Sequence, residues 1–227
     1  ERARFQSARF FTTVDFARGP GDVFGRLGLR QYDPVNTGQH DGVQIGALGE
    51  EGDDGVVLQV TPGEADQPLL SETFPSYNFD VMDGVTYEID LSQPSKFGPK
   101  GEMENPDANR IKNLAFNGQP VTEDMEFIVA TNNYRASGGG SFPGADGSTV
   151  VFEAPDTNRD VIVRYIVEKG TISPRADANW RFAPMEGAAV LFQTGPKAAD
   201  YIDDLKGVDI APAGDGADGF ALFRLKL

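Results

Sequence analysis

Apolar and polar residues alternate over several short stretches of this chain, a period of two that predicts half-buried β-strands. The clearest stretch is 86–91, which has the sequence Thr-Tyr-Glu-Ile-Asp-Leu. An Asn-Gly pair at positions 117 and 118 follows another apolar run and predicts a turn. We expect further strands at 112–116, 126–130, 149–152, 180–182, 189–193 and 220–227.

Two other stretches have the features of helices. Residues 156–169 start with Thr157 and Asp160 at a capping-box-like spacing, and Gly170 follows as a natural stop. Residues 196–205 start with a proline and carry apolar residues on one face. Because strands outnumber helices and do not alternate regularly with them, the pattern predicts an α+β fold with mixed or antiparallel sheets and a few flanking helices.

The beginning of the chain has a different pattern from the rest. An apolar cluster that includes Phe5 and Phe11 stands among basic residues, and a stretch rich in glycine and aspartate follows it. The run 56–60 is the one clear strand candidate before position 62. We therefore expect a partly irregular N-terminal arm or insertion at 1–61 and a compact domain at 62–227.

The chain of 227 residues is acidic, because 35 Asp and Glu residues against 20 Lys and Arg residues give a net charge of −15. This charge argues against nucleic-acid polymers and anionic membranes as partners, since both require a cationic surface. A small anion needs only a local cluster of cations, which Arg135 and Arg159 could supply. The sequence has no cysteine and no apolar run of membrane-spanning length, so we expect neither disulfides nor a membrane span.

Polar, aromatic and glycine residues come together in residues 130–144, directly after a strand-like run. Glycines let backbone amides approach a ligand, and an aromatic ring beside asparagine amides offers a stacking face with groups that can pair with a base edge. The alternative is a glycine-rich hairpin with a packed tyrosine. The candidate substrate-binding residues are Asn132, Asn133, Tyr134, Arg135, Gly138, Gly139, Gly140 and Phe142.

A series of motifs, taken in their order along the chain, resembles one known family. They are Asp-Gln-Pro-Leu at 66–69, Ser-Tyr-Asn-Phe-Asp-Val at 76–81, Gly-Val-Thr-Tyr-Glu-Ile-Asp at 84–90, Arg-Ile-Lys-Asn-Leu at 110–114, the loop at 132–144, and the stretches 155–159, 179–182 and 219–221. Together they resemble the C-terminal domain of the bacterial 5′-nucleotidase family, within it the 2′,3′-cyclic-nucleotide 2′-phosphodiesterase/3′-nucleotidase branch. The resemblance covers about 62–227.

The resemblance implies a parent enzyme that hydrolyses phosphate esters with two divalent metal ions, held by ligands in an N-terminal domain. This chain has a single histidine, His40, which cannot assemble such a centre. We therefore expect no catalytic residue and no cofactor in this chain, with the metals in an N-terminal metallophosphoesterase domain outside it. The first residue is not Met, so we expect a piece of a longer protein. The resemblance implies a periplasmic or secreted location and a role in nucleotide catabolism.

For the site, the resemblance implies that Tyr134 forms one face of an aromatic sandwich around the base of a nucleotide or nucleoside. In the 5′-nucleotidase branch an aspartate that grips the ribose hydroxyls stands where this chain has Gly140. The lack of a carboxylate there fits a ribose whose 2′,3′ edge carries phosphate, and a flexible glycine without that role is the alternative.

Two further choices stay open at this point. Arg135 could reach a phosphate or pair with one of the many carboxylates, and Asn132 and Asn133 could bind the base or cap a turn. The resemblance implies structural roles for Tyr77, Asn78 and Asp80. The rival function, from a different class, is a non-catalytic carbohydrate- or protein-binding β-rich module.

Overall fold

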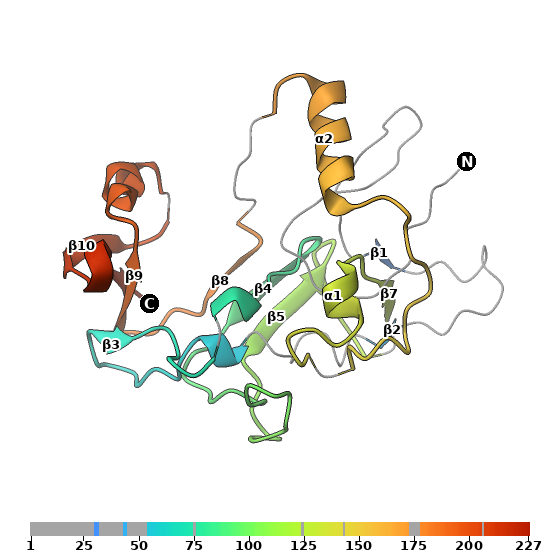
Figure 1. Ribbon diagram of the computed structural model, residues 1–227. Helices are drawn as coiled ribbons and strands as arrows, with labels where there is room; N and C mark the ends of the chain where they lie inside the picture. Colours follow the sequence, from blue (N-terminus) through green and yellow to red (C-terminus); the bar gives the residue numbers. More distant parts are fainter. Residues whose placement is uncertain are drawn as a thin grey trace.

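The computed structural model describes residues 54–74, 76–123, 125–142, 144–172, 178–205 and 207–227, together with two short strands at 30–31 and 43–44. The described strands form one 3-stranded and two 4-stranded sheets, and α-helices are few, which confirms the predicted α+β class. Figure 1 shows the C-terminal sheet at one end of the molecule. The helices α1 (Asn133–Ala136) and α2 (Asn158–Lys169) lie at the other end, with a second sheet between.

The central sheet has the strand order β6-β5-β4-β8. β4 (Val85–Ile89) pairs antiparallel with β5 (Ile111–Phe116) and parallel with β8 (Trp180–Phe182). A two-residue Asn-Gly turn joins β5 to β6 (Gln119–Pro120), and its residues have positive φ angles of 51° and 77°. Asn-Gly is favoured in such turns because both residues tolerate positive φ, so the predicted turn is confirmed.

The C-terminal sheet has the order β10-β11-β9-β3. β11 (Ala221–Lys226) pairs antiparallel with β9 (Ala189–Thr194) on one side and with β10 (Ile210–Asp215) on the other. The short strand β3 (Gln67–Pro68) adds a parallel edge. The sequence pattern missed β10, because a proline and a glycine interrupt its apolar alternation and shift its register.

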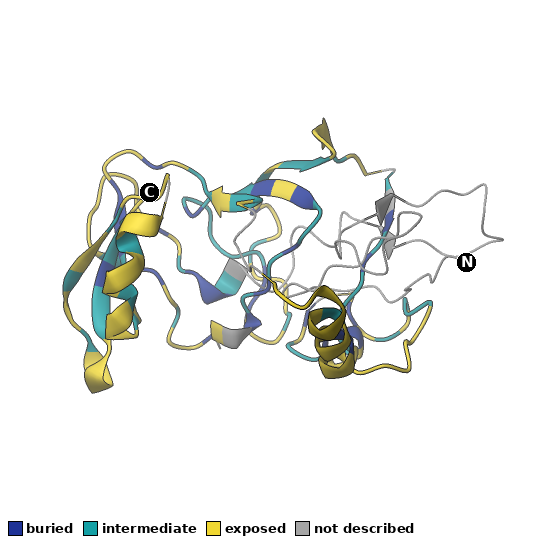
Figure 2. Cartoon of the chain, turned by 90° about the horizontal axis from the view of Figure 1, so that it is seen from above, coloured by how far each residue is buried: buried dark blue, intermediate teal, exposed yellow. Residues whose placement is uncertain are grey.

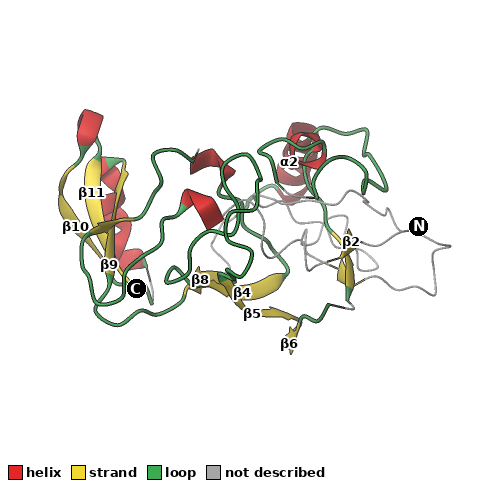
Figure 3. Ribbon diagram, turned by 90° about the horizontal axis from the view of Figure 1, so that it is seen from below, coloured by secondary structure: helices red, strands yellow, loops and turns green. Residues whose placement is uncertain are grey.

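The third sheet places β7 (Glu126–Ile128) between β1 (Arg30–Gln31) and β2 (Val43–Gln44), with both pairs antiparallel. The strand predicted at 126–130 is therefore confirmed. β7 leads directly into α1 (Figure 1), so this sheet carries the segment that the sequence singles out. Figure 3 shows the strands β8, β4, β5 and β6 of the central sheet between the C-terminal sheet and β2.

Helix α2 is held chiefly by its ends. The backbone N–H of Asp160 donates to Thr157 Oγ1 at 3.2 Å, and Gly170 ends the helix with a φ of 72°. Val161 is its buried residue, whereas Ile162, Val163, Ile166 and Val167 are exposed. The helix predicted at 156–169 is confirmed. Among the described residues no helix has both the length and the apolar character to cross a membrane.

Two predicted strands are wrong. Residues 149–152 form no strand, and the N–H of Val150 instead closes a turn on the carbonyl of Gly147 at 3.2 Å. The run 56–60 contributes the end of the 3₁₀ helix η3 (Asp54–Val56) and an isolated bridge between Val57 and Leu70. An apolar run indicates burial, but a strand also requires a partner strand within hydrogen-bonding distance, which the run itself does not supply.

The helix predicted at 196–205 is a 3₁₀ helix, η5 (Pro196–Asp204), rather than an α-helix. It has no buried residue, so it lacks the packed apolar face that stabilises most α-helices in proteins. The other 3₁₀ turns are η4 (Ser76–Asn78) and η6 (Ala217–Gly219). The boundary predicted at 61/62 stays a prediction, although Val57 and Val60 on its N-terminal side are buried in the core.

Two exposed ion pairs join segments that are far apart in the sequence, the first between neighbouring strands and the second between β11 and the residue before β3. Arg181 Nε donates to Glu88 Oε1 at 2.8 Å, between β8 and β4. This hydrogen bond, with a second one from Asn113, lowers the pKa of the Glu88 carboxyl. Arg224 Nη2 donates to Asp66 Oδ2 at 2.8 Å, which likewise lowers the pKa of Asp66. Because water screens exposed pairs, we expect little stability from either.

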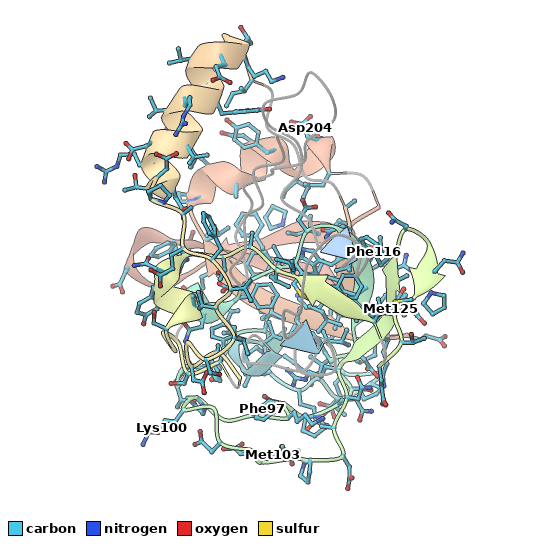
Figure 4. All side chains as sticks on the ribbon, turned by 90° about the vertical axis from the view of Figure 1, so that its right-hand side faces the viewer. Phe97, Lys100, Met103, Phe116, Met125 and Asp204 are labelled. Carbon is cyan, nitrogen blue, oxygen red and sulfur yellow. The ribbon has the colours of Figure 1, made fainter. Side chains whose placement is uncertain are left out.

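The main core lies where the central sheet meets β7 and the segments around it (Figure 2). Phe127 on β7 is completely buried and meets the ring of Phe116 on β5 edge to face, with centroids 5.2 Å apart. Figure 4 shows Phe116 and Met125 on the same flank of this core. The same cluster includes Val190 on β9, so all three sheets contribute to one apolar core, and the base of the β7–α1 segment is fixed in it.

We predict that Phe127→Ala lowers the free energy of unfolding by about 3–5 kcal/mol, because it empties a fully buried aromatic position. Urea unfolding followed by circular dichroism measures the change. Phe220→Ala is the matched control, since Phe220 is 49% exposed and its loss should cost less than about 1 kcal/mol. Equal losses for the two variants would contradict this description of the core.

Candidate functional site

The candidate loop, residues 132–142, starts with one helical turn rather than with a glycine turn. α1 follows β7 almost immediately, and Asn132 is its N-cap residue. The Asn132 side-chain oxygen accepts a hydrogen bond of 2.8 Å from the backbone N–H of Arg135. Of the two roles considered for Asn132, the structure shows capping. Asn133, the first residue of the helix, is exposed.

Tyr134 projects from α1 and is 61% exposed. Its backbone carbonyl accepts a hydrogen bond of 2.8 Å from the N–H of Gly139. A Cβ atom added at Gly139 would lie 2.5 Å from ring atoms of Tyr134, so the ring rests against the glycine backbone. This contact supports one part of the ring and leaves much of the remainder open to solvent.

Arg135 is buried, with 5% of its surface exposed, and its Cζ atom lies 5.7 Å from the centroid of the Tyr134 ring. Its guanidinium donates two hydrogen bonds to the carboxylate of Asp80 in a bidentate arrangement, from Nε to Oδ2 at 2.7 Å and from Nη2 to Oδ1 at 2.9 Å. Nη1 also donates to Asn78 Oδ1 at 3.0 Å. Of the two partners considered for Arg135, the structure shows the carboxylate.

Phe142 lies beneath the same guanidinium. The Arg135 Cζ atom stands 4.4 Å from the centroid of the Phe142 ring, close enough for a cation–π contact. Phe142 is only 3% exposed and belongs to the core cluster. The structure therefore places this predicted site residue behind the loop, as a support for Arg135, rather than on the surface beside Tyr134.

The three glycines of the loop differ in what they permit. Gly138 and Gly140 have positive φ angles of 97° and 89°, which favour glycine over any residue with a side chain. A Cβ at Gly140 would also stand 2.1 Å from Arg135 Nη1. Backbone conformation and the buried guanidinium thus account for glycine at 140 without reference to a ribose edge.

Sequence reasoning placed Asn78 and Asp80 among structural residues and did not connect them with the loop. Both are buried, Asn78 at 4% and Asp80 at 8% exposed, and they contact Arg135 across 57 and 55 positions of sequence. The one signal in the sequence was the presence of two polar residues next to the apolar pair Phe79 and Val81. That signal indicates burial with a partner but does not identify it.

The chemical groups exposed at the loop suit binding rather than catalysis. They are the ring of Tyr134 and the side chains of Asn133, Ser137 and Ser141, with the half-buried backbone of the glycines beside them. No group of three or more His, Cys, Asp or Glu side chains among the described residues could hold a metal ion. His40 lies outside the described residues.

A family model matches more than half of the chain. It describes the C-terminal domain of 5′-nucleotidase and matches residues 28–147. The match includes every residue of the candidate loop as well as Asn78 and Asp80. It also starts before position 62, within the segment predicted as an arm.

Curated relatives show the same similarity. The trifunctional nucleotide phosphoesterase protein YfkN of Bacillus subtilis is 42% identical over 74% of this chain and 12% of its own length. The 2′,3′-cyclic-nucleotide 2′-phosphodiesterase/3′-nucleotidase of Salmonella typhimurium is 44% identical over 71% of this chain and 26% of its own. The protein of that name from Haemophilus influenzae is 38% identical over 76% and 28%. The chain therefore spans only 12% to 28% of the length of these relatives. No solved structure gives a significant match.

We predict that alanine changes the free energy of unfolding strongly at Gly140 and hardly at all at the adjacent Gly139. Gly140→Ala should lower the free energy of unfolding by about 1–3 kcal/mol, because the methyl group meets a buried guanidinium at a positive φ. Gly139→Ala should change it by less than about 0.5 kcal/mol, because the exposed ring of Tyr134 can turn away.

Denaturant unfolding measures both changes, and fluorine NMR of fluorotyrosine at position 134 reports the ring. The Tyr134 signal should move in Gly139→Ala while stability holds. Similar stabilities for the two variants, or an unmoved signal in Gly139→Ala, would contradict the packing described for the loop.

Proposed function

The chain belongs to the 5′-nucleotidase C-terminal domain family, and from that premise we propose that it recognises the base of a nucleotide for a 2′,3′-cyclic-nucleotide 2′-phosphodiesterase/3′-nucleotidase. The observation that carries this proposal is the exposed ring of Tyr134, which rests on the backbone of Gly139. A supported aromatic face suits a nucleobase, because stacking needs one open face and little reorganisation on binding.

The exposed amide of Asn133 stands next to this ring in the sequence and can donate to or accept from a base edge. Arg135 takes no direct part, because Asp80 already satisfies its charge. The loop therefore presents a largely neutral surface to its ligand. That surface matches a base and sugar better than it matches a phosphate group.

The chemical step belongs, on this proposal, to a metallophosphoesterase domain outside this chain. The relatives carry phosphoesterase or nucleotidase names and are several times longer than this chain. In such a division the two metal ions of the other domain supply the activated water and stabilise charge on the phosphate. The residues of this chain bind and orient the nucleoside part. Nucleotide catabolism in the periplasm or outside the cell is the setting we propose.

We predict that Tyr134→Ala raises the dissociation constant for adenosine at least about tenfold, since base–aromatic stacking contributes roughly 1–3 kcal/mol. Tyr134→Phe keeps the ring and should change the constant less than about threefold. Tyr201→Ala is the matched control, because Tyr201 is equally exposed at 63% but lies on η5. Isothermal titration measures the constants.

Unchanged affinity in a folded Tyr134→Ala variant would remove Tyr134 from the site. A wild-type chain that binds a simple pyranoside or a peptide but not adenosine would favour the rival module. The exposed ring of Tyr134 is compatible with that rival function too, because many carbohydrate- and protein-binding surfaces make contact through an exposed aromatic side chain.

We also predict that this chain alone does not hydrolyse 2′,3′-cyclic AMP or 3′-AMP when Mn²⁺ or Zn²⁺ is added. Its sequence has one histidine, and its described residues include no group of three candidate ligands. Release of inorganic phosphate from 3′-AMP, and of 3′-AMP from the cyclic substrate, measures the reaction. Metal-dependent turnover that disappears in His40→Ala would overturn the division of labour proposed here.

A further inference from the structure

We infer that Asp80 and Asn78 are positioning residues for the candidate loop and control its affinity for a nucleoside through Arg135, without touching the ligand. This inference rests on the proposed function. Neither side chain lies on the surface, since Asp80 is 8% and Asn78 4% exposed. Asn78 is the last residue of η4 and Asp80 follows it closely, so both are remote in sequence from the loop.

The first step of the argument is that one side chain holds the loop at two places. Arg135 belongs to α1, and its Nη1 also donates to the carbonyl of Gly139 at 3.2 Å. Tyr134 is the neighbour of Arg135 in the chain, and its ring rests on Gly139. The guanidinium therefore holds both α1, from which the Tyr134 ring projects, and Gly139, on which that ring rests.

The second step is that Asp80 and Asn78 fix the guanidinium. Asp80 accepts two parallel hydrogen bonds, which define the plane and the direction of the fork. Asn78 accepts a third one, and the N–H of Asp80 donates to the carbonyl of Asn78 at 3.0 Å, so the two acceptors are held together. The Phe142 ring lies against the guanidinium with its centroid 4.4 Å from Cζ, and the centroid of the Tyr134 ring lies 5.7 Å from the same atom.

The third step separates orientation from stability. A buried ion pair is costly to desolvate, and apolar residues of similar volume often replace one without loss of stability. Such a replacement loses the fixed orientation of the loop, because a methionine or leucine side chain has no planar set of hydrogen-bond donors like that of the guanidinium. An apolar pair at 80 and 135 should therefore keep the fold and release the loop.

The experiment compares four variants of the full chain. Asp80→Asn leaves the guanidinium buried with a weakened partner, and Asp80→Leu combined with Arg135→Met removes the pair. Asn78→Ala removes one acceptor and is the milder alternative if the double variant does not fold. Glu88→Gln is the control, because it changes a carboxylate in the exposed pair with Arg181.

Three measurements are made on each variant: the unfolding midpoint, the dissociation constant for adenosine, and amide hydrogen exchange at 138–141. We expect Asp80→Asn to lower the unfolding midpoint and the double variant to have the wild-type midpoint. In the double variant, adenosine should bind at least about tenfold more weakly, and amide exchange at 138–141 should be at least about tenfold faster. Asn78→Ala should raise exchange and weaken binding about threefold, and Glu88→Gln should change none of these.

A double variant, or Asn78→Ala, with wild-type affinity and wild-type exchange at 138–141 would overturn the inference and leave the pair a purely structural contact. If wild-type chain does not bind adenosine at all, the proposed function fails. Hydrogen exchange then still decides the positioning role, because it needs no ligand. The two failures are therefore distinguishable.

Discussion

The packing of the whole candidate loop depends on the buried ion pair between Arg135 and Asp80. A guanidinium out of contact with water needs a partner for its charge and acceptors for its N–H groups. The protein supplies the two oxygens of Asp80, the amide oxygen of Asn78 and the carbonyl of Gly139, with the ring of Phe142 against one face. Segments that are 55 positions apart thereby become parts of one arrangement.

The glycines of the loop follow from this arrangement. Gly140 lies so close to Arg135 that no Cβ fits, and its φ of 89° disfavours other residues independently. The absence of an aspartate there therefore has a sufficient steric cause within the chain. Gly139 has a different use, because its bare backbone allows the ring of Tyr134 to lie against it while most of that ring stays exposed.

These contacts give the two neighbours Tyr134 and Arg135 opposite roles. One turn of helix directs the first toward solvent and the second into the core, where the cation is neutralised. A site built in this way offers an aromatic face without an unpaired cation from Arg135. This arrangement is consistent with the proposed function, in which this domain would hold the nucleoside and a domain outside this chain would act on the phosphate.

The sequence by itself determined the α+β class, the position of the central strands, the Asn-Gly turn and the caps of α2, because each depends on local periodicity or on the backbone preferences of a few adjacent residues. Its motifs also identified the family. The sequence singled out the loop, gave Phe142 as a candidate at the ligand, and left two explanations for Gly140, a phosphorylated ribose edge or a flexible glycine without that role. Only the tertiary structure showed that Asp80 and Asn78 contact Arg135 and that Phe142 is buried against the guanidinium. It also showed that residues 149–152 form no strand. Contacts between segments far apart in sequence decide these features, and a residue's type alone does not specify its distant partner.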